Sequence, residues 1–143
     1  MNPIPVSLER YFFTTQSIIA NPDHDINNAS TKFYLKIDSN FSVLPQQNNR
    51  YGVEVTVSLD KENSINPPYD VIVTAFGVIQ VTDERIDPNQ IDYLLKVSGH
   101  QMMIGVIRER IAEMTSRGPW PTTHLNFIPL QVNIEPLSVD RAG

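Results

Sequence analysis

The sequence predicts a single α+β domain, spanning residues 1–143, in which strands fill the first half of the chain and one long helix follows them. Two observations support this class. Four stretches before residue 82 alternate apolar with polar side chains or are rich in β-branched residues, as strands are. A later stretch, from about Gly99 to Arg117, carries apolar residues at three- and four-residue steps, as an amphipathic helix does. A chain of 143 residues is long enough to bury one core.

The two middle strands have the clearest pattern. In "YGVEVTVSLD" the odd-numbered residues from Tyr51 to Leu59 are apolar, whereas Glu54, Thr56 and Ser58 are polar. The segment "KFYLKIDSNFSVL" repeats this alternation. The polar "PQQNNR" between them is typical of a turn. The two strands are therefore predicted to pair as an antiparallel hairpin with one buried face.

The first strand, "VSLERYFFTTQSII", changes the phase of its apolar residues near Arg10. Val6 and Leu8 share one parity, whereas Tyr11 and Phe13 share the other. This change predicts either a β-bulge or a strand with two apolar faces.

The fourth strand, "DVIVTAFGVIQV", is apolar on both faces. Its two faces carry, respectively, Val71, Val73 and Val81, and Ile72, Phe76 and Val78. One helix layer covers only one face of a small sheet, so the second apolar face is expected to meet another subunit or an apolar ligand. Self-association is the favoured prediction.

Two helices are predicted after the strands. Asp87, followed by Pro88, is expected to cap a short helix that runs through Leu95. The long helix is expected to stop at Gly118, because glycine suits the left-handed position after a helix and Pro119 cannot continue the turn.

The single tryptophan, Trp120, stands between two prolines in "RGPWP". Pro121 restricts Trp120 to extended conformations, so the backbone aims the indole. The next residues, "THLNFIPLQVNIEP", are predicted to form an extended C-terminal arm. The sequence leaves open whether Trp120 packs into the core or lines a binding surface.

Charge and composition exclude several classes of function. With 11 Lys and Arg against 16 Asp and Glu, the net charge of −5 disfavours nucleic acid and anionic membranes as partners. The absence of cysteine excludes disulfides, thiolate catalysis and cysteine metal sites. No apolar run approaches the roughly 20 residues that a membrane span needs, and the first residues lack the apolar region of a secretory signal. A cytoplasmic location without membrane insertion is therefore expected.

No motif in the sequence demands catalysis. His24, His100 and His124 are far apart and only His24 has acidic neighbours, so no metal site is expected. The acidic residues of "DERID" after the fourth strand are expected to cap a helix and face water. A G-x-S-x-G elbow, a P-loop and a dinucleotide fingerprint are all missing. The chain is therefore predicted to be no enzyme and to need no cofactor.

The region around the end of the long helix, "RERIAEMTSRGPWPTTHLNFIPLQV", resembles the SecB family of export chaperones. In that family the helix ends in Ser-Arg-Gly, an aromatic residue and a proline follow, and an extended "N-L-x-P-V-N-F" arm comes next. The matching residues here are Ser116, Arg117, Gly118, Trp120, Pro121, Leu125, Asn126, Pro129 and Val132. The stretches "AFGVIQV" and "LERYFF" are also similar to family strands. The resemblance covers nearly the whole chain, and the motif after the helix is its specific part.

This resemblance implies a four-stranded antiparallel sheet with one long helix, assembled as a dimer or a dimer of dimers. It also implies ATP-independent binding of unfolded polypeptides in long apolar grooves. The clients are expected to lie across the strands, the polar connection at residues 21–31 and the Trp120 arm. The residues predicted to line the groove are Phe12, Ile18, Phe33, Phe76, Val78, Trp120, Leu125 and Phe127. The residues predicted for the oligomer interface are Met103, Ile107, Ile111 and Met114.

Departures from the family pattern bear on the partner. Thr15 and Ile19 stand where the family has carboxylates that help it dock the translocase motor SecA, and Ile72 stands at the position of a further family acid. Weak or absent binding to SecA is therefore expected. The second helix of the family is not expected, because Pro136 would break it.

The predicted function is thus that of a SecB-like holdase outside the main export route. Some relatives in the family serve toxin-antitoxin pairs, which need the groove but not the motor contact. The alternative is a non-catalytic adaptor that holds one specific protein partner, such as a toxin-antitoxin component. The sequence does not choose the client.

Overall fold

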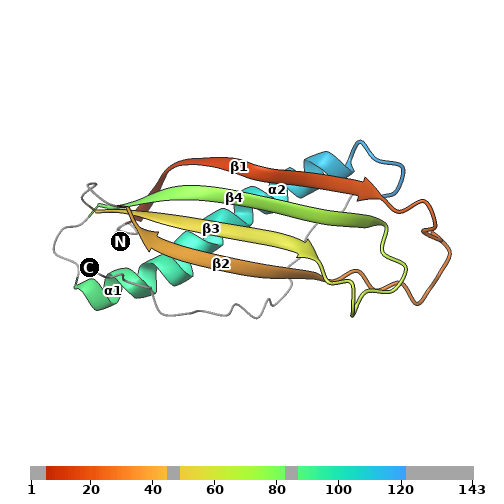
Figure 1. Cartoon of the computed structure of the whole chain (residues 1–143), viewed down its shortest axis with the longest axis horizontal. Helices are drawn as coiled ribbons and strands as arrows, with labels where there is room; N and C mark the ends of the chain where they lie inside the picture. The colour runs from red at the N-terminus through yellow and green to blue at the C-terminus, as the bar shows by residue number, and fades with distance from the viewer. Residues whose placement is uncertain (1–5, 45–48, 83–86, 122–143) are drawn as a thin grey trace, which may run out of the picture.

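The computed structural model describes residues 6–44, 49–82 and 87–121, which form one antiparallel sheet and one long helical segment (Figure 1). The strands are β1 (Val6–Ala20), β2 (Leu35–Val43), β3 (Arg50–Leu59) and β4 (Tyr69–Val81). Their order in the sheet is β1-β4-β3-β2, so β1 and β2 are the edge strands. The predicted α+β class, with a four-stranded antiparallel sheet and one long helix, is confirmed.

The helical segment packs diagonally across one face of the sheet (Figure 1). We call this the inner face and the opposite one the outer face. Alternation gives each strand one row of side chains on the inner face, and on β3 and β4 half of these are valines with almost no exposed surface. The helix adds Met103, Ile107 and Ile111, which lie at helical spacing and are fully buried. Gly77 lets the helix come close to β4, because a Cβ there would collide with the sulfur of Met103.

The predicted change of phase in β1 is a β-bulge. The pairing with β4 shifts between Leu8 and Arg10, so the extra residue is Glu9. Because of this shift, Leu8 before the bulge and Tyr11 after it point to the same face, although their parities differ. A second shift, between Phe13 and Thr15, was not predicted.

The predicted hairpin of β2 and β3 is confirmed, with Leu35 opposite Leu59 and Val43 opposite Tyr51. Residues 45–48 of the turn lie outside the described part of the chain. The turn ends at Asn49, whose positive φ of 61° is a conformation that asparagine tolerates well.

The helices are joined, contrary to the prediction of two separate ones. The short helix α1 (Pro88–Leu94) has the predicted cap, since the carboxylate of Asp87 accepts a hydrogen bond from the backbone N–H of Asn89. A π-helical turn, η1 (Leu95–Gly99), continues it without a break into α2 (His100–Thr115). A π-helical turn contains one extra residue compared with an α-helical turn. This extra residue changes the phase of the apolar side chains between α1 and α2.

The expected left-handed conformation at Gly118 is wrong, because no described glycine has a positive φ. The glycine is needed for a different reason. A Cβ at Gly118 would collide with the hydroxyl of Tyr69, the first residue of β4. The glycine therefore allows the segment after α2 to lie close to the sheet. The predicted arm, residues 123–136, lies outside the described part of the chain, as do its residues Leu125 and Phe127 and the expected lack of a second helix.

Candidate peptide-binding surface

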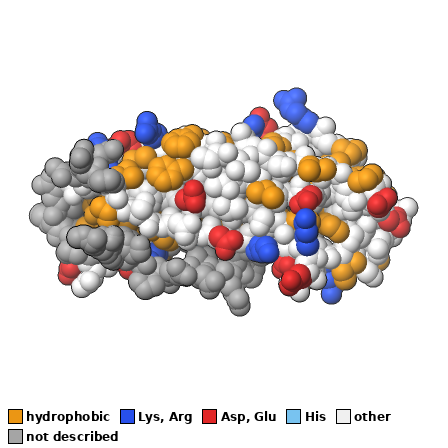
Figure 2. All heavy atoms as spheres, in the orientation of Figure 1, with side chains coloured by type: hydrophobic (Ala, Val, Ile, Leu, Met, Phe, Trp, Pro, Cys, Tyr) orange, Lys and Arg blue, Asp and Glu red, His pale blue; other side chains and the backbone are white. Residues whose placement is uncertain are grey.

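The outer face of the sheet carries an apolar patch that no described element covers. Figure 2 views the molecule in the orientation of Figure 1, and apolar side chains gather toward β1 and β4, whereas acidic and basic ones lie mostly over β3 and β2. The residues of this outer-face patch are Phe12, Ile19, Ile72, Phe76 and Val78. Exposed fractions are 45% for Phe12, 43% for Ile72 and 61% for Ile19. These values are high for large apolar side chains in one cluster.

An aromatic pair forms the middle of the patch. Phe12 lies directly opposite Phe76 in the pairing of β1 with β4, and the ring centroids are 5.6 Å apart with an interplanar angle of 33°. Phe76 also leans over β3, where a Cβ on Gly52 would come within 2.7 Å of its ring. Gly52 therefore leaves the space that the Phe76 ring occupies above the sheet.

An aliphatic pair lies nearer the end of the sheet. Ile72 is opposite Ser17, and Ile19 is opposite Asp70, so the two isoleucines are diagonal neighbours. The hydroxyl of Thr74 separates this pair from the aromatic pair and lies 2.9 Å from the hydroxyl of Thr56 on β3. The patch thus has an aromatic part and an aliphatic part with a threonine between them.

An ion pair closes the other end of the patch. The bulge residue Glu9 accepts hydrogen bonds from Nε of Arg50 through both carboxylate oxygens, at 3.1 and 2.9 Å. Arg50 is on β3 and Glu9 is on β1, so the pair crosses over β4, which lies between them. Val78, in this part of β4, is only 4% exposed. The patch is therefore exposed at Ile19, Ile72 and Phe12, and it ends at the buried Val78 and the ion pair.

Trp120 docks at the opposite end of the sheet. Its indole Nε1 donates to the backbone oxygen of Asn21 at 3.0 Å, and the ring of His24 meets it edge-on at 4.9 Å. The hydroxyl of Tyr69 accepts from the backbone N–H of Trp120 and donates to its carbonyl, both at 3.0 Å. Trp120 is half-buried and packs against the core. The described contacts of Trp120 are thus those of an anchor for the chain after α2.

The structure brings together part of the predicted groove. Phe12, Phe76 and Val78 share the outer face, as stated. Ile18 points to the inner face, where with Met114 it lines an open pocket of about 410 Å³ beside the end of α2. The remaining described groove residues, Phe33 and Trp120, pack against the core. The predicted groove residues therefore do not form one continuous surface in the single chain.

Three residues of the patch region were absent from the predicted groove. Ile72 was named in the second apolar face of the fourth strand and as a departure from a family pattern, Ile19 was named only as such a departure, and Gly52 was not singled out at all. Ile72 carried a usable signal as part of the second apolar face of its strand, and Ile19 carried one because most outer-face residues of β1 are polar. Gly52 carried a weaker one, since a glycine inside a strand marks a close approach.

The residues predicted for an oligomer interface are mostly internal to the single chain. Met103, Ile107 and Ile111 are fully buried against the sheet, and Met114 is half-buried. Their role in an interface stays a prediction, and their contacts in the described chain are those of a core.

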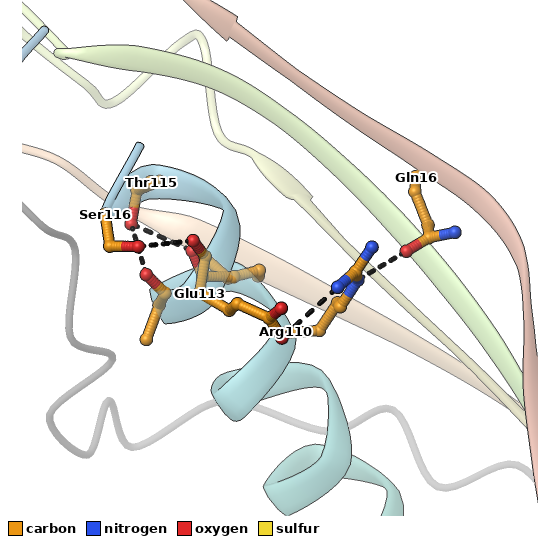
Figure 3. Close-up of polar contacts among 7 residues, drawn as sticks. Gln16, Arg110, Glu113, Thr115 and Ser116 are labelled. Atoms are coloured by element: carbon orange, nitrogen blue, oxygen red, sulfur yellow. Dashed lines mark hydrogen bonds and ion pairs between the residues drawn. The ribbon is translucent and has the colours of Figure 1, made fainter. Parts of the chain in front are cut away.

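Arg110 joins α2 to the edge strand β1 (Figure 3). Its Nε donates to Oε1 of Gln16 at 2.6 Å, and its guanidinium lies 5.8 Å from the ring centroid of Phe13. A second nitrogen is 3.2 Å from the carboxylate of Glu113. Close by, the hydroxyl of Ser116 donates to the backbone oxygen of Glu113 at 2.6 Å. The contacts of Arg110 with Gln16 and Phe13 hold this part of α2 against β1, and the contacts with Glu113 lie within the helical segment.

The inner face also holds a buried histidine. His100 begins α2 and is 7% exposed, and its Nδ1 lies 2.9 Å from the hydroxyl of Ser39 on β2. Burial lowers the pKa of His100, because the charged imidazolium would lose its hydration. His100 is therefore a neutral residue of the core near pH 7.

Two further findings concern only the residues described here. Within 6–44, 49–82 and 87–121, no three His, Cys, Asp or Glu side chains lie close enough together to hold a metal ion. In the same ranges, no helix has the length and apolar character needed to cross a membrane.

Comparisons with known proteins give a likeness of fold. No protein-family model and no curated protein matches the sequence. Among solved structures, the Rv1957 SecB-like chaperone of Mycobacterium tuberculosis, in complex with a ChAD peptide from the Rv1956 HigA1 antitoxin, superposes with a TM-score of 0.62. The likeness covers 87% of this chain and 91% of that one at 10% identity. A protein of unknown function from Streptococcus agalactiae has a TM-score of only 0.45 at 12% identity, covering 88% of this chain and all of that one. The sheet and long helix of this chain therefore have a SecB-like fold.

Proposed function

We propose that this protein is an ATP-independent chaperone that binds extended segments of unfolded polypeptide on the outer-face patch. The observation that carries the proposal is the apolar patch itself, on the uncovered side of a SecB-like sheet. A sheet of this kind needs only its inner face to fold, so large exposed side chains on the other face cost solubility without stabilising the chain. They fit a binding surface.

The geometry of the patch suits an extended client. The aromatic and aliphatic pairs follow the seam between β1 and β4, and from Ile72 to Phe76 the strand rises by about 13 Å. A client that lies on this face contacts side chains rather than the hydrogen-bonding groups of the sheet. Contacts through apolar side chains tolerate many client sequences, as a chaperone requires.

The solved structure with the same fold supports a polypeptide as the ligand. The Rv1957 chaperone is seen with a peptide from an antitoxin. We propose that this chain also binds polypeptide. We further propose that the protein is a homo-oligomer in the cytoplasm, as the sequence predicts.

The test is a suppression assay with matched variants. The double variant Phe12→Ser/Ile72→Ser is expected to lose most of the ability to keep several unfolded substrates from aggregating at equimolar ratio. The control Lys36→Ser changes an exposed residue of the same face on β2, outside the patch, and is expected to behave like the unchanged protein. Full activity of the double variant, with both proteins folded, would refute the proposal.

A second candidate is an adaptor for one partner, and the single antitoxin peptide in the related structure favours it. Titration against a panel of unrelated unfolded substrates separates the two. Comparable affinities for all of them support a holdase, whereas binding to one alone supports an adaptor.

Weak or absent binding to SecA is part of the same proposal. Thr15, Ile19 and Ile72 all lie on the outer face, so hydroxyl and apolar groups occupy the three positions at which the SecB family has carboxylates. The carboxylate of this stretch, Asp70, lies opposite Ile19 and is 3.5 Å from Nζ of Lys61. Titration with SecA is expected to show no saturable binding at micromolar concentrations.

A further inference from the structure

The way the chain leaves α2 bears on what covers the outer-face patch. Trp120 is anchored to Asn21, which directly follows the last residue of β1. Ile19 of the patch is two residues before Asn21, or about 7 Å along the strand. The chain that follows Pro121 therefore starts beside the aliphatic end of the patch.

The length of that chain is sufficient to reach the patch. Passing from the inner to the outer side around the end of β1 takes about 10 Å, which three extended residues span. Six further extended residues cover about 20 Å, the length of the patch from Ile19 to Phe12. Residues up to 134 can therefore lie anywhere along the seam of β1 and β4.

The sequence of that chain is complementary to the patch. In "LQVNI", Leu130, Val132 and Ile134 alternate with Gln131 and Asn133, so an extended conformation would turn three apolar side chains to one side. Leu130 and Ile134 have the same four-residue separation as Ile72 and Phe76. Val132 would then face the threonine between the two pairs. Residues 122–134 also contain no Asp, Glu, Lys or Arg, so no unpaired charge would be brought over the patch.

We propose that residues 130–134 of the same chain bind the outer-face patch and compete with the client for it. This inference rests on the proposed function and adds a regulatory step to it. A tethered competitor acts at an effective concentration near millimolar, so a segment of modest affinity lowers the apparent affinity of clients. Clients of low affinity then remain unbound, whereas long apolar clients bind tightly enough to displace the segment.

Disulfide trapping in the full chain tests the contact, and the absence of native cysteine makes the result unambiguous. Thr15→Cys lies on the outer face between the two pairs, and it is combined with Val132→Cys. A disulfide within one chain is expected after mild oxidation. The control pair, Lys36→Cys with Val132→Cys, uses another exposed outer-face position and is expected to remain reduced. Equal trapping of both pairs, or a disulfide only between two chains, would overturn the inference.

Competition is tested with a labelled peptide of residues 122–134 added to full-length protein. The variant Leu130→Ser/Val132→Ser/Ile134→Ser frees the patch and is expected to bind this peptide about ten-fold more tightly than the unchanged protein, following the removal of the tethered competitor. Adding Phe12→Ser is expected to cancel the gain. Unchanged peptide affinity in the triple variant would overturn the inference. The proposed function would survive that result as long as Phe12→Ser/Ile72→Ser still loses suppression of aggregation.

Discussion

The two faces of the sheet belong to the same four strands, yet they are made for different purposes. On the inner face, alternate residues of β3 and β4 are nearly all buried, with valine the commonest among them, and α2 covers them. On the outer face, β2 and β3 carry serine, threonine and charged residues, and apolar side chains appear only along β1 and β4. The inner face accounts for folding, so the apolar residues of the outer face are free to serve binding.

The largest expected difference in stability is between two variants that place a carboxylate at neighbouring positions of β4, one on each face. Val73 is fully buried, and Val73→Asp is expected to cost about 4 kcal/mol or more, because an unpaired carboxylate would enter the core. Ile72 is 43% exposed, and Ile72→Asp is expected to change stability by less than about 1 kcal/mol. Urea unfolding followed by circular dichroism measures both. Similar losses for the two variants would break the comparison of the faces.

Glycine replacements test how closely the helix packs on the inner face. Gly77→Ala would press a methyl group against Met103, so a loss of about 1–3 kcal/mol is expected. Gly105 is on the exposed side of α2, where an added methyl group would meet no other part of the protein within 4 Å. Gly105→Ala is therefore expected to raise stability by about 0.5–1 kcal/mol. If Gly105→Ala instead weakened self-association in analytical ultracentrifugation, a second chain would approach the helix at this point.

The hydroxyl of Tyr69 connects the inner face to the segment after α2. Tyr69→Phe removes both hydrogen bonds to the backbone of Trp120, for an expected loss of about 1–2 kcal/mol. Tyr93, on α1 and 66% exposed, provides the control Tyr93→Phe, which is expected to be neutral. Thermal unfolding and the fluorescence of Trp120, the single tryptophan, report the two effects together. Equal stability of both variants would argue that Trp120 is not anchored as described.

The smallest expected effect is a pH dependence that belongs to the inner face. Burial lowers the pKa of His100 below the ordinary value of about 6.5, so just below that pH the unfolded chain binds a proton that the folded chain refuses. Stability is therefore expected to fall as the pH drops through 6.5, and His100→Gln is expected to remove this slope. The hydrogen bond from Asn63 lowers the pKa of Asp60 below 3.8, so Asp60 titrates outside this range. Urea unfolding midpoints of the unchanged protein and of His100→Gln, measured between pH 7.5 and 5.5, test this prediction. Equal slopes with pH in the two proteins would contradict it.

Much of the fold followed from local patterns in the sequence. Alternation marked β2, β3 and the inner face of β4, because a period of two is imposed by the strand itself. The bulge in β1 was visible as a change of phase at Arg10, since a bulge moves every later residue to the opposite parity. The cap at Asp87 could also be predicted from local sequence, because its hydrogen-bond donor, the backbone N–H of Asn89, lies only two residues away.

Features that depend on distant residues were not readable. Gly118 is required because Tyr69 lies against it, and Trp120 is held by contacts with Asn21 and His24. These three partners belong to strands and connections far earlier in the chain. The predicted groove joined residues of both faces, because a list of apolar residues does not record which side of the sheet each one occupies. Strand pairing resolves this, and it places Phe12 with Phe76 but separates both from Ile18.

The two bulges in β1 have a consequence for solubility. A straight edge strand of this length would present a second chain with a long row of unpaired N–H and C=O groups, the template on which fibrils grow. The extra residues Glu9 and Thr14 divide that row into short runs, and one of them places a carboxylate at the interruption. The longest remaining run, residues 15–20, begins with Thr15, Gln16 and Ser17. Their polar side chains are unfavourable in the dehydrated interface between the sheets of a fibril. The edge strand is thereby kept from seeding the aggregates that its proposed clients form.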